Sequence, residues 1–159
     1  MLSVGTISWG TLRSKDLIGS FMDVLLEHNM SAARALQKEY REVFQNIDND
    51  EFMDASEDAT WLVEALFEAL NEIAPPFCYF GAIDGDGADF GFWADEDAVQ
   101  ESILHAEPVP NTDYRVSIDD LVLWEVNDHG NVTGYHLLNA AQGRSKNIHD
   151  HQGPFIELG

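Results

Sequence analysis

Apolar residues recur every three or four positions through the first half of the chain. This spacing predicts a helix that Ser14 caps and that stops near Asn29, and a second helix over Ser31–Ile47 that Ser31 caps. It also predicts a third helix that Ser56 opens and Pro75-Pro76 ends. The apolar faces of the three helices are Leu17, Ile18, Phe21, Val24 and Leu25; Ala32, Leu36, Tyr40, Val43 and Ile47; and Leu62, Leu66, Ala69, Leu70 and Ile73.

After the two prolines the pattern changes to short aromatic runs separated by turn residues. Residues 77–83 and 88–93 flank Asp84-Gly85-Asp86-Gly87, and this arrangement predicts a β-hairpin. Asp95-Glu96-Asp97 is typical of the acidic first turn of a helix, which we expect to extend to Leu104.

A second pair of runs completes the pattern. Residues 121–126 and 132–138 flank Asn127-Asp128-His129-Gly130 and predict another hairpin, and Phe155-Ile156 is expected to add an edge strand. Helices followed by hairpins indicate an α+β fold, in which the N-terminal helices pack on a small C-terminal antiparallel sheet.

Length and composition fit one folded domain. The 159 residues are 45% hydrophobic and include nine Phe, four Trp and four Tyr, so the chain can bury a core and is too aromatic for an acidic disordered tail. We expect a single domain over 1–159, with a helical half at about 12–74 and an antiparallel β half at about 77–158. The acidic segment 48–51 is expected to link the second and third helices.

The sequence also predicts where the protein works. The single cysteine, Cys78, excludes an internal disulfide and fits a reducing compartment. Residues 1–4 lack the basic and apolar regions of a signal peptide, and no apolar run approaches the ~18 residues of a membrane span. We therefore expect a cytoplasmic protein that does not enter a membrane.

The charge of the chain is concentrated in its middle. Residues 45–142 contain 22 acidic residues, one arginine and no lysine, and they carry all of the net charge of −21. A pI near 4.2 disfavours direct binding to nucleic acid or anionic membrane, which needs Lys and Arg. The imbalance favours a basic protein or a cation as partner. Adaptation to high salt is an alternative, although residues 1–44 are neutral overall.

The third predicted helix places acidic residues on one face. Glu64, Glu68 and Glu72 are four residues apart, about 6 Å of rise, and no lysine alternates with them. Such a stripe can simply be a solvated face, yet a small domain needs a net charge of only about 2–8 for solubility. We therefore predict a contact surface for a basic protein, and its residues are Glu64, Glu68, Glu72, Asp95, Glu96 and Asp97.

The first hairpin turn carries three carboxylates within six residues, at Asp84, Asp86 and Asp89. Calcium prefers oxygen ligands on a flexible loop, so a calcium site is one interpretation. The other is a plain turn in which Gly85 adopts positive φ. An alternative function is that of a metal-dependent enzyme, whose site would consist of these three aspartates and His129. No other cofactor is expected.

Other candidate groups are explained by ordinary structural roles. His149-Asp150-His151 contains metal-ligand residue types but fits a polar tail, and Cys78 lies in an aromatic run where a core position is expected. Phosphate-binding, dinucleotide-binding, hydrolase and zinc-protease motifs are absent from the sequence, so we do not expect catalysis. The four tryptophans are expected in the core or in a protein interface.

Three segments support a resemblance. The segments PPFCYFGA at 75–82, GDGADFGFW at 85–93 and NDHGNVT at 127–133 resemble small acidic proteins of bacteriophages, prophages and bacterial mobile elements. That resemblance implies a setting and not a mechanism. Phage-borne acidic proteins are sometimes nucleic-acid mimics that block host defence proteins, and by that association we expect a non-enzymatic binding protein. The hairpin around 84–90 also resembles that of Smi1/Knr4 (SUKH) immunity proteins, which implies an immunity module as an alternative.

Overall fold

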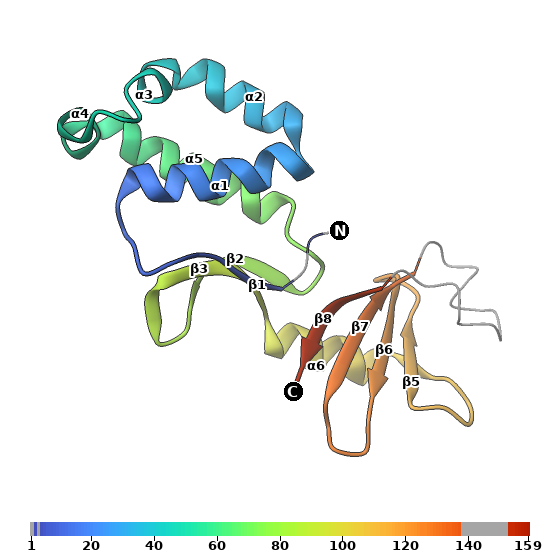
Figure 1. Ribbon diagram of the computed structural model, residues 1–159. Coiled ribbons are helices and arrows are strands. Elements are labelled where there is room, and N and C mark those ends of the chain that lie inside the picture. The colour runs from blue at the N-terminus through green and yellow to red at the C-terminus, as the bar shows by residue number, and fades with distance from the viewer. Residues whose placement is uncertain (1, 3, 138–152) are drawn as a thin grey trace. The chain divides into compact units, whose positions relative to one another are not determined.

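The computed structural model describes residues 2, 4–137 and 153–159. It contains two compact units, each described here by itself (Figure 1). The helical unit comprises Gly5–Ala74 and Tyr79–Trp93, and the sheet unit comprises Met1–Val4, Pro75–Cys78 and Ala94–Gly159. That the whole chain behaves as one domain stays a prediction.

The helical unit combines five helices with a three-stranded sheet of order β1-β3-β2, in which β1 and β3 are antiparallel. Helices α1 and α5 lie over one face of this sheet (Figure 1). The elements are β1 (Gly5–Trp9), α1 (Ser14–His28), α2 (Met30–Glu39), α3 (Arg41–Gln45), α4 (Asp50–Ala55), α5 (Glu57–Glu72), β2 (Cys78–Ile83) and β3 (Asp86–Ala94).

Phenylalanine rings join the helices to this sheet. Phe21 of α1 packs edge-on against Phe80 of β2, with ring centroids 4.9 Å apart, and Phe67 of α5 packs against Phe90 of β3 at 5.5 Å. Asn71 ties the end of α5 to β2, because its side chain accepts a hydrogen bond from the Phe80 N–H (2.9 Å) and donates one to the Phe80 carbonyl (3.0 Å). These contacts with the sheet fix the orientation of α5, and with it the direction in which the residues of its outer face point.

Two predicted helix caps are wrong. The N-cap of α1 is Arg13, without a side-chain bond, and Ser14 is the first helical residue. Helix α2 is capped by Asn29, whose side chain accepts from the Ala32 N–H at 3.2 Å, so Ser31 lies inside the helix. One asparagine thus ends α1 and starts α2, which leaves no room for a separate serine cap.

The predicted second helix is interrupted, and the predicted linker is partly helical. Tyr40 leaves helical geometry (φ −101°, ψ 36°) and separates α2 from α3. Asn49 caps the short helix α4, so the acidic segment 48–51 enters a helix. The cap of α5 is correct, since the Ser56 hydroxyl accepts from the Ala59 N–H at 3.2 Å.

The sheet unit is an antiparallel sheet of order β4-β5-β6-β7-β8 with one helix. Trp124 is fully buried in its core, and its indole N–H donates to the Ser102 hydroxyl of the helix at 3.0 Å. Ser102 in turn donates to Asp120, also at 3.0 Å. The elements are α6 (Glu96–His105), β4 (Glu107–Pro108), β5 (Tyr114–Ser117), β6 (Val122–Val126), β7 (Val132–His136) and β8 (Pro154–Leu158).

The α+β prediction is confirmed, as are both hairpins, the helix after Asp95 and the edge strand at 155–156. Three strands were not predicted: β1, β4 and β5. In the helical unit, the sheet beneath the helices includes the N-terminal strand β1, so the chain begins with a strand rather than a helix.

Candidate acidic interface

The outer face of α5 carries the predicted acidic stripe. Buried Leu62, Leu66 and Leu70 hold one side of the helix against the unit's core, and Glu64, Glu68 and Glu72 are all exposed on another. At about 6 Å apart, two such carboxylates repel by roughly 0.7 kcal/mol in a water-like dielectric. The stripe is therefore present as predicted, and it opposes folding instead of assisting it.

Little positive charge is available to neutralise this region. Arg13 pairs with Asp50 at 3.3 Å, and Lys15 lies 3.6 Å from Asp48 and 3.5 Å from Asp50. Within the part of the chain that the structure describes, these two aspartates are the only carboxylates of residues 45–142 with an ion pair. The α5 stripe has none.

The remaining bases of the helical unit lie on α2 and α3. Arg34, Lys38 and Arg41 are exposed, and among the described residues none of them has a carboxylate within 4 Å. They reduce the net negative charge of the unit, but they form no ion pair with the glutamates of α5.

Tyr40 reveals that acidic groups from two helices converge. Burial raises the pKa of Tyr40, and the carboxylates of Glu39, Asp58, Glu64 and Glu68 raise it further. Carboxylates of α2 and of α5 therefore act on the same phenol, as expected where the end of α2 packs near α5. No pattern in the sequence indicates this effect, because it depends on how α2 packs on α5.

An exposed tryptophan precedes the stripe. At about 100° per residue, Glu57, Trp61, Glu64, Glu68 and Glu72 fall within one arc of α5, and Trp61 lies along the helix between Glu57 and Glu64. Its side chain is 52% exposed. An indole among carboxylates can bind a cation on its face, so the surface offers apolar area as well as charge. The sequence predicted the tryptophans in the core or in a protein interface, and the structure excludes the core for Trp61.

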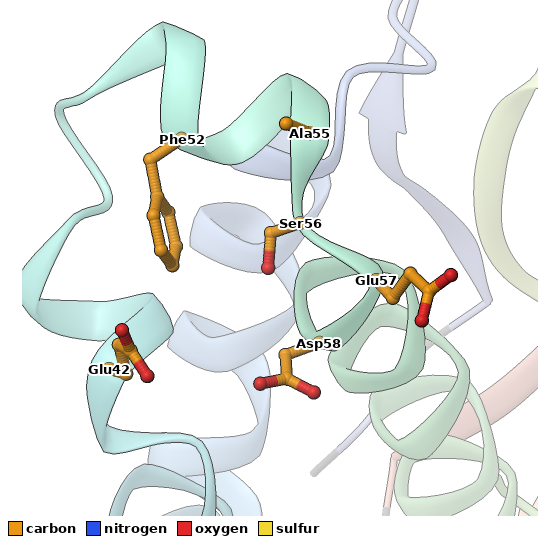
Figure 2. Close-up of a pocket in the computed structure, with 6 residues that line it drawn as sticks. All are labelled: Glu42, Phe52, Ala55, Ser56, Glu57 and Asp58. Carbon is orange, nitrogen blue, oxygen red and sulfur yellow. The ribbon is translucent and has the colours of Figure 1, made fainter.

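A pocket of about 510 Å³ adjoins this face. It is lined by residues of α3, α4 and the start of α5, which are Glu42, Phe52, Ala55, Ser56, Glu57 and Asp58 (Figure 2). Asp58 lines the pocket, and it raises the pKa of Tyr40 together with Glu64 and Glu68 of the stripe. We call the pocket and the stripe together the α5 face.

The second predicted acidic group begins α6. Asp95 is the N-cap, and its side chain accepts from the Ala98 N–H at 3.1 Å, while Glu96 and Asp97 occupy the first turn. Carboxylates stabilise a helix at this end, so these three exposed residues have a local structural role. They belong to the sheet unit, whereas Glu64, Glu68 and Glu72 belong to the helical unit.

The Asp-Gly segment forms a hairpin turn. Gly85 has φ +90°, as the turn interpretation predicts, and Asp86 accepts from the Ala88 N–H at 3.0 Å. Asp84 and Asp86 are exposed, whereas Asp89 lies within β3 opposite Trp9, with one carboxylate oxygen buried and unpartnered. Among the described residues no three His, Cys, Asp or Glu side chains gather to hold a metal ion, so these aspartates are not brought together.

The remaining candidates are placed as follows. His129 is exposed in the second hairpin turn, in a different unit from the aspartates of the first hairpin. His149-Asp150-His151 lies outside the described residues. Cys78 packs against the core of the sheet unit, and burial raises the pKa of its thiol to about 11. A protonated, half-buried thiol is a poor nucleophile. The predicted core position is met only in part, because Cys78 is half-buried against the core.

The chain matches no family model, no curated protein and no solved structure. None of the described helices has the length and apolar character needed to cross a membrane. A functional assignment for this chain therefore depends on its own surface, of which the α5 face is the most distinctive part.

Proposed function

We propose that the protein is a non-enzymatic binding protein whose α5 face docks on a basic protein surface, of the kind that normally holds nucleic acid. The observation that carries this proposal is the unneutralised stripe of Glu64, Glu68 and Glu72, which begins one turn after exposed Trp61. Charge of this density reduces stability, so a compensating role in association is a physical reason for its presence.

Three features support docking over simple solubility. The bases of the helical unit leave the stripe unpaired in the described residues, acids of two helices raise the pKa of Tyr40, and Trp61 adds apolar area beside the stripe. Interfaces are enriched in tryptophan, whereas a surface built only for solubility carries few exposed aromatics. The resemblance to phage and mobile-element proteins suggests a host protein that binds nucleic acid as the target.

Affinity capture tests the proposal. The wild-type protein, immobilised at about 0.05 M salt, is expected to retain a basic protein from a bacterial lysate and to release it as salt rises toward about 0.5 M, because screening weakens charge pairing. Mass spectrometry identifies the retained protein. Recovery of no basic protein at low salt would remove the support for this function.

Charge reversal then locates the contact. Replacing Glu64, Glu68 and Glu72 together with Lys is expected to weaken binding of the captured protein roughly tenfold or more, since each attractive pair becomes repulsive. The matched control changes three exposed acids of the sheet unit by the same total charge, with Lys at positions Glu107, Asp113 and Asp128. Equal losses in both variants would refute the α5 face as the contact surface.

A further inference from the structure

The pocket beside the stripe has one aromatic wall and two acidic ones. Figure 2 shows the ring of Phe52 extending from α4 toward Glu42 of α3, with Asp58 on the α5 side of the same space. The carboxylate of Glu57 is directed away from it (Figure 2). Ser56 is already engaged, because its hydroxyl caps α5 through the Ala59 N–H. The groups left to meet a ligand are therefore an aromatic ring and two carboxylates.

We infer that this pocket binds an arginine side chain of the basic partner, an inference that rests on the proposed function. A guanidinium group is planar, stacks on an aromatic face and donates hydrogen bonds in several directions within its plane. Phe52 supplies the face, and Glu42 and Asp58, from separate helices, supply acceptors on different sides. A volume of about 510 Å³ is ample for one side chain.

The same geometry disfavours other cations. A lysine ammonium is compact and strongly hydrated, so it gains less from the flat ring and from two separated carboxylates. A metal ion needs more ligands than the pocket offers, and the described residues contain no cluster of three suitable side chains. Asp58 also belongs to the acidic environment of Tyr40, so an arginine bound here lies next to the stripe.

Three peptides test the inference. They share one basic sequence and differ at a single position, which is arginine, lysine or citrulline; citrulline keeps the planar shape and lacks the charge. Titration calorimetry at low salt is expected to show the arginine peptide binding wild-type protein roughly tenfold more tightly than the citrulline peptide, with the lysine peptide between them. Equal affinity for the arginine and citrulline peptides would overturn the inference.

Variants of the pocket locate the binding. Asp58→Asn and Phe52→Leu are each expected to reduce the arginine preference several-fold, whereas Asp54→Asn, an equal charge change at an exposed position of the same short helix α4, leaves it unchanged. Backbone NMR spectra confirm that each variant is folded. Because Asp58→Asn alters an exposed side chain, it keeps the test decisive if Phe52→Leu disturbs the fold. If the arginine preference of the pocket variants equals that of Asp54→Asn, the pocket is not the binding site for arginine.

The two proposals fail in different ways. If the Lys variant at Glu64, Glu68 and Glu72 loses the captured partner while the pocket variants keep the arginine peptide at full affinity, the pocket is excluded and the docking function stands. If the pocket variants lose the arginine preference while the stripe variant still binds the captured partner, the pocket stands and the stripe is refuted as a docking contact.

Discussion

At the scale of single residues, the pKa of Tyr40 reports on the charges of the acidic face. Tyr40 reports on it because burial and the carboxylates of Glu39, Asp58, Glu64 and Glu68 all raise its pKa. A phenol whose pKa is raised in the folded state favours folding below its ordinary pKa near 10, and that contribution is lost as pH rises through the folded value. Tyr40 is therefore expected to weaken the fold only under alkaline conditions.

The first prediction uses this titration. Replacing Glu64 and Glu68 with Gln is expected to lower the pKa of Tyr40 toward its ordinary value, leaving the part of the shift that burial causes. Residue-resolved NMR of labelled tyrosine measures it between about pH 8 and pH 12. Glu72→Gln is the control, since Glu72 is not among the charges that act on Tyr40. Equal shifts in both variants would contradict the convergence described here.

At the scale of elements, helix α5 carries its charge in an unfavourable place. Glu57 and Asp58 occupy its first turn, where the helix dipole stabilises negative charge, but Glu72 is its last residue and no base lies in the last turn. The dipole and the neighbouring Glu68 both oppose Glu72. A carboxylate at this position costs stability, which is consistent with a role in binding. Its effect on stability can be tested by comparing substitutions at the two ends of α5.

Glu72→Lys is expected to stabilise the helical unit by about 0.5–1 kcal/mol, because it relieves repulsion and places a cation at the negative end of α5. Glu57→Lys changes the net charge equally but in the first turn, so it is expected to destabilise by a similar amount. Urea unfolding followed by circular dichroism compares the two. A change of the same sign and size in both would mean that overall net charge, and not position on the helix, determines stability.

Elements with local signals were predictable from the sequence, and those set by distant partners were not. The hairpins carry their own turn residues, such as Gly85, and α5 carries its own cap and stripe. Strand β1 pairs with β3, which lies some 80 residues away, so nothing nearby marks it. The interruption at Tyr40 has the same character, because neither glycine nor proline marks it in the sequence.

The same division applies to the candidate site. The stripe of Glu64, Glu68 and Glu72 follows from four-residue spacing and could be predicted. The pocket could not, since Glu42, Phe52 and Asp58 come from three helices, one of which lies where a linker was expected. Asp120 shows the converse, because a carboxylate that looks like surface charge is bonded to Ser102 and Ser117 in the sheet unit.

At the scale of the whole molecule, a net charge of −21 sets opposite salt dependences for folding and binding. Salt shortens the screening length from about 10 Å at 0.1 M to about 3 Å at 1 M, which weakens the repulsion among the carboxylates. The ion pairs that the same salt weakens in the described residues are few and exposed, chiefly those of Arg13 and Lys15. Repulsion therefore dominates the response.

The thermal midpoint is accordingly expected to rise between 0.1 and 1 M NaCl, over the range in which the screening length shrinks and affinity for a basic partner falls. Calcium chloride at equal ionic strength separates screening from specific binding. If both salts raise the midpoint equally, screening accounts for the effect; a larger rise with calcium would mean a bound cation and would revive the turn at Asp84 and Asp86 as its site. A midpoint that falls with salt would mean that attractive pairs outweigh repulsion, and the argument for an external cationic partner would lose its physical basis.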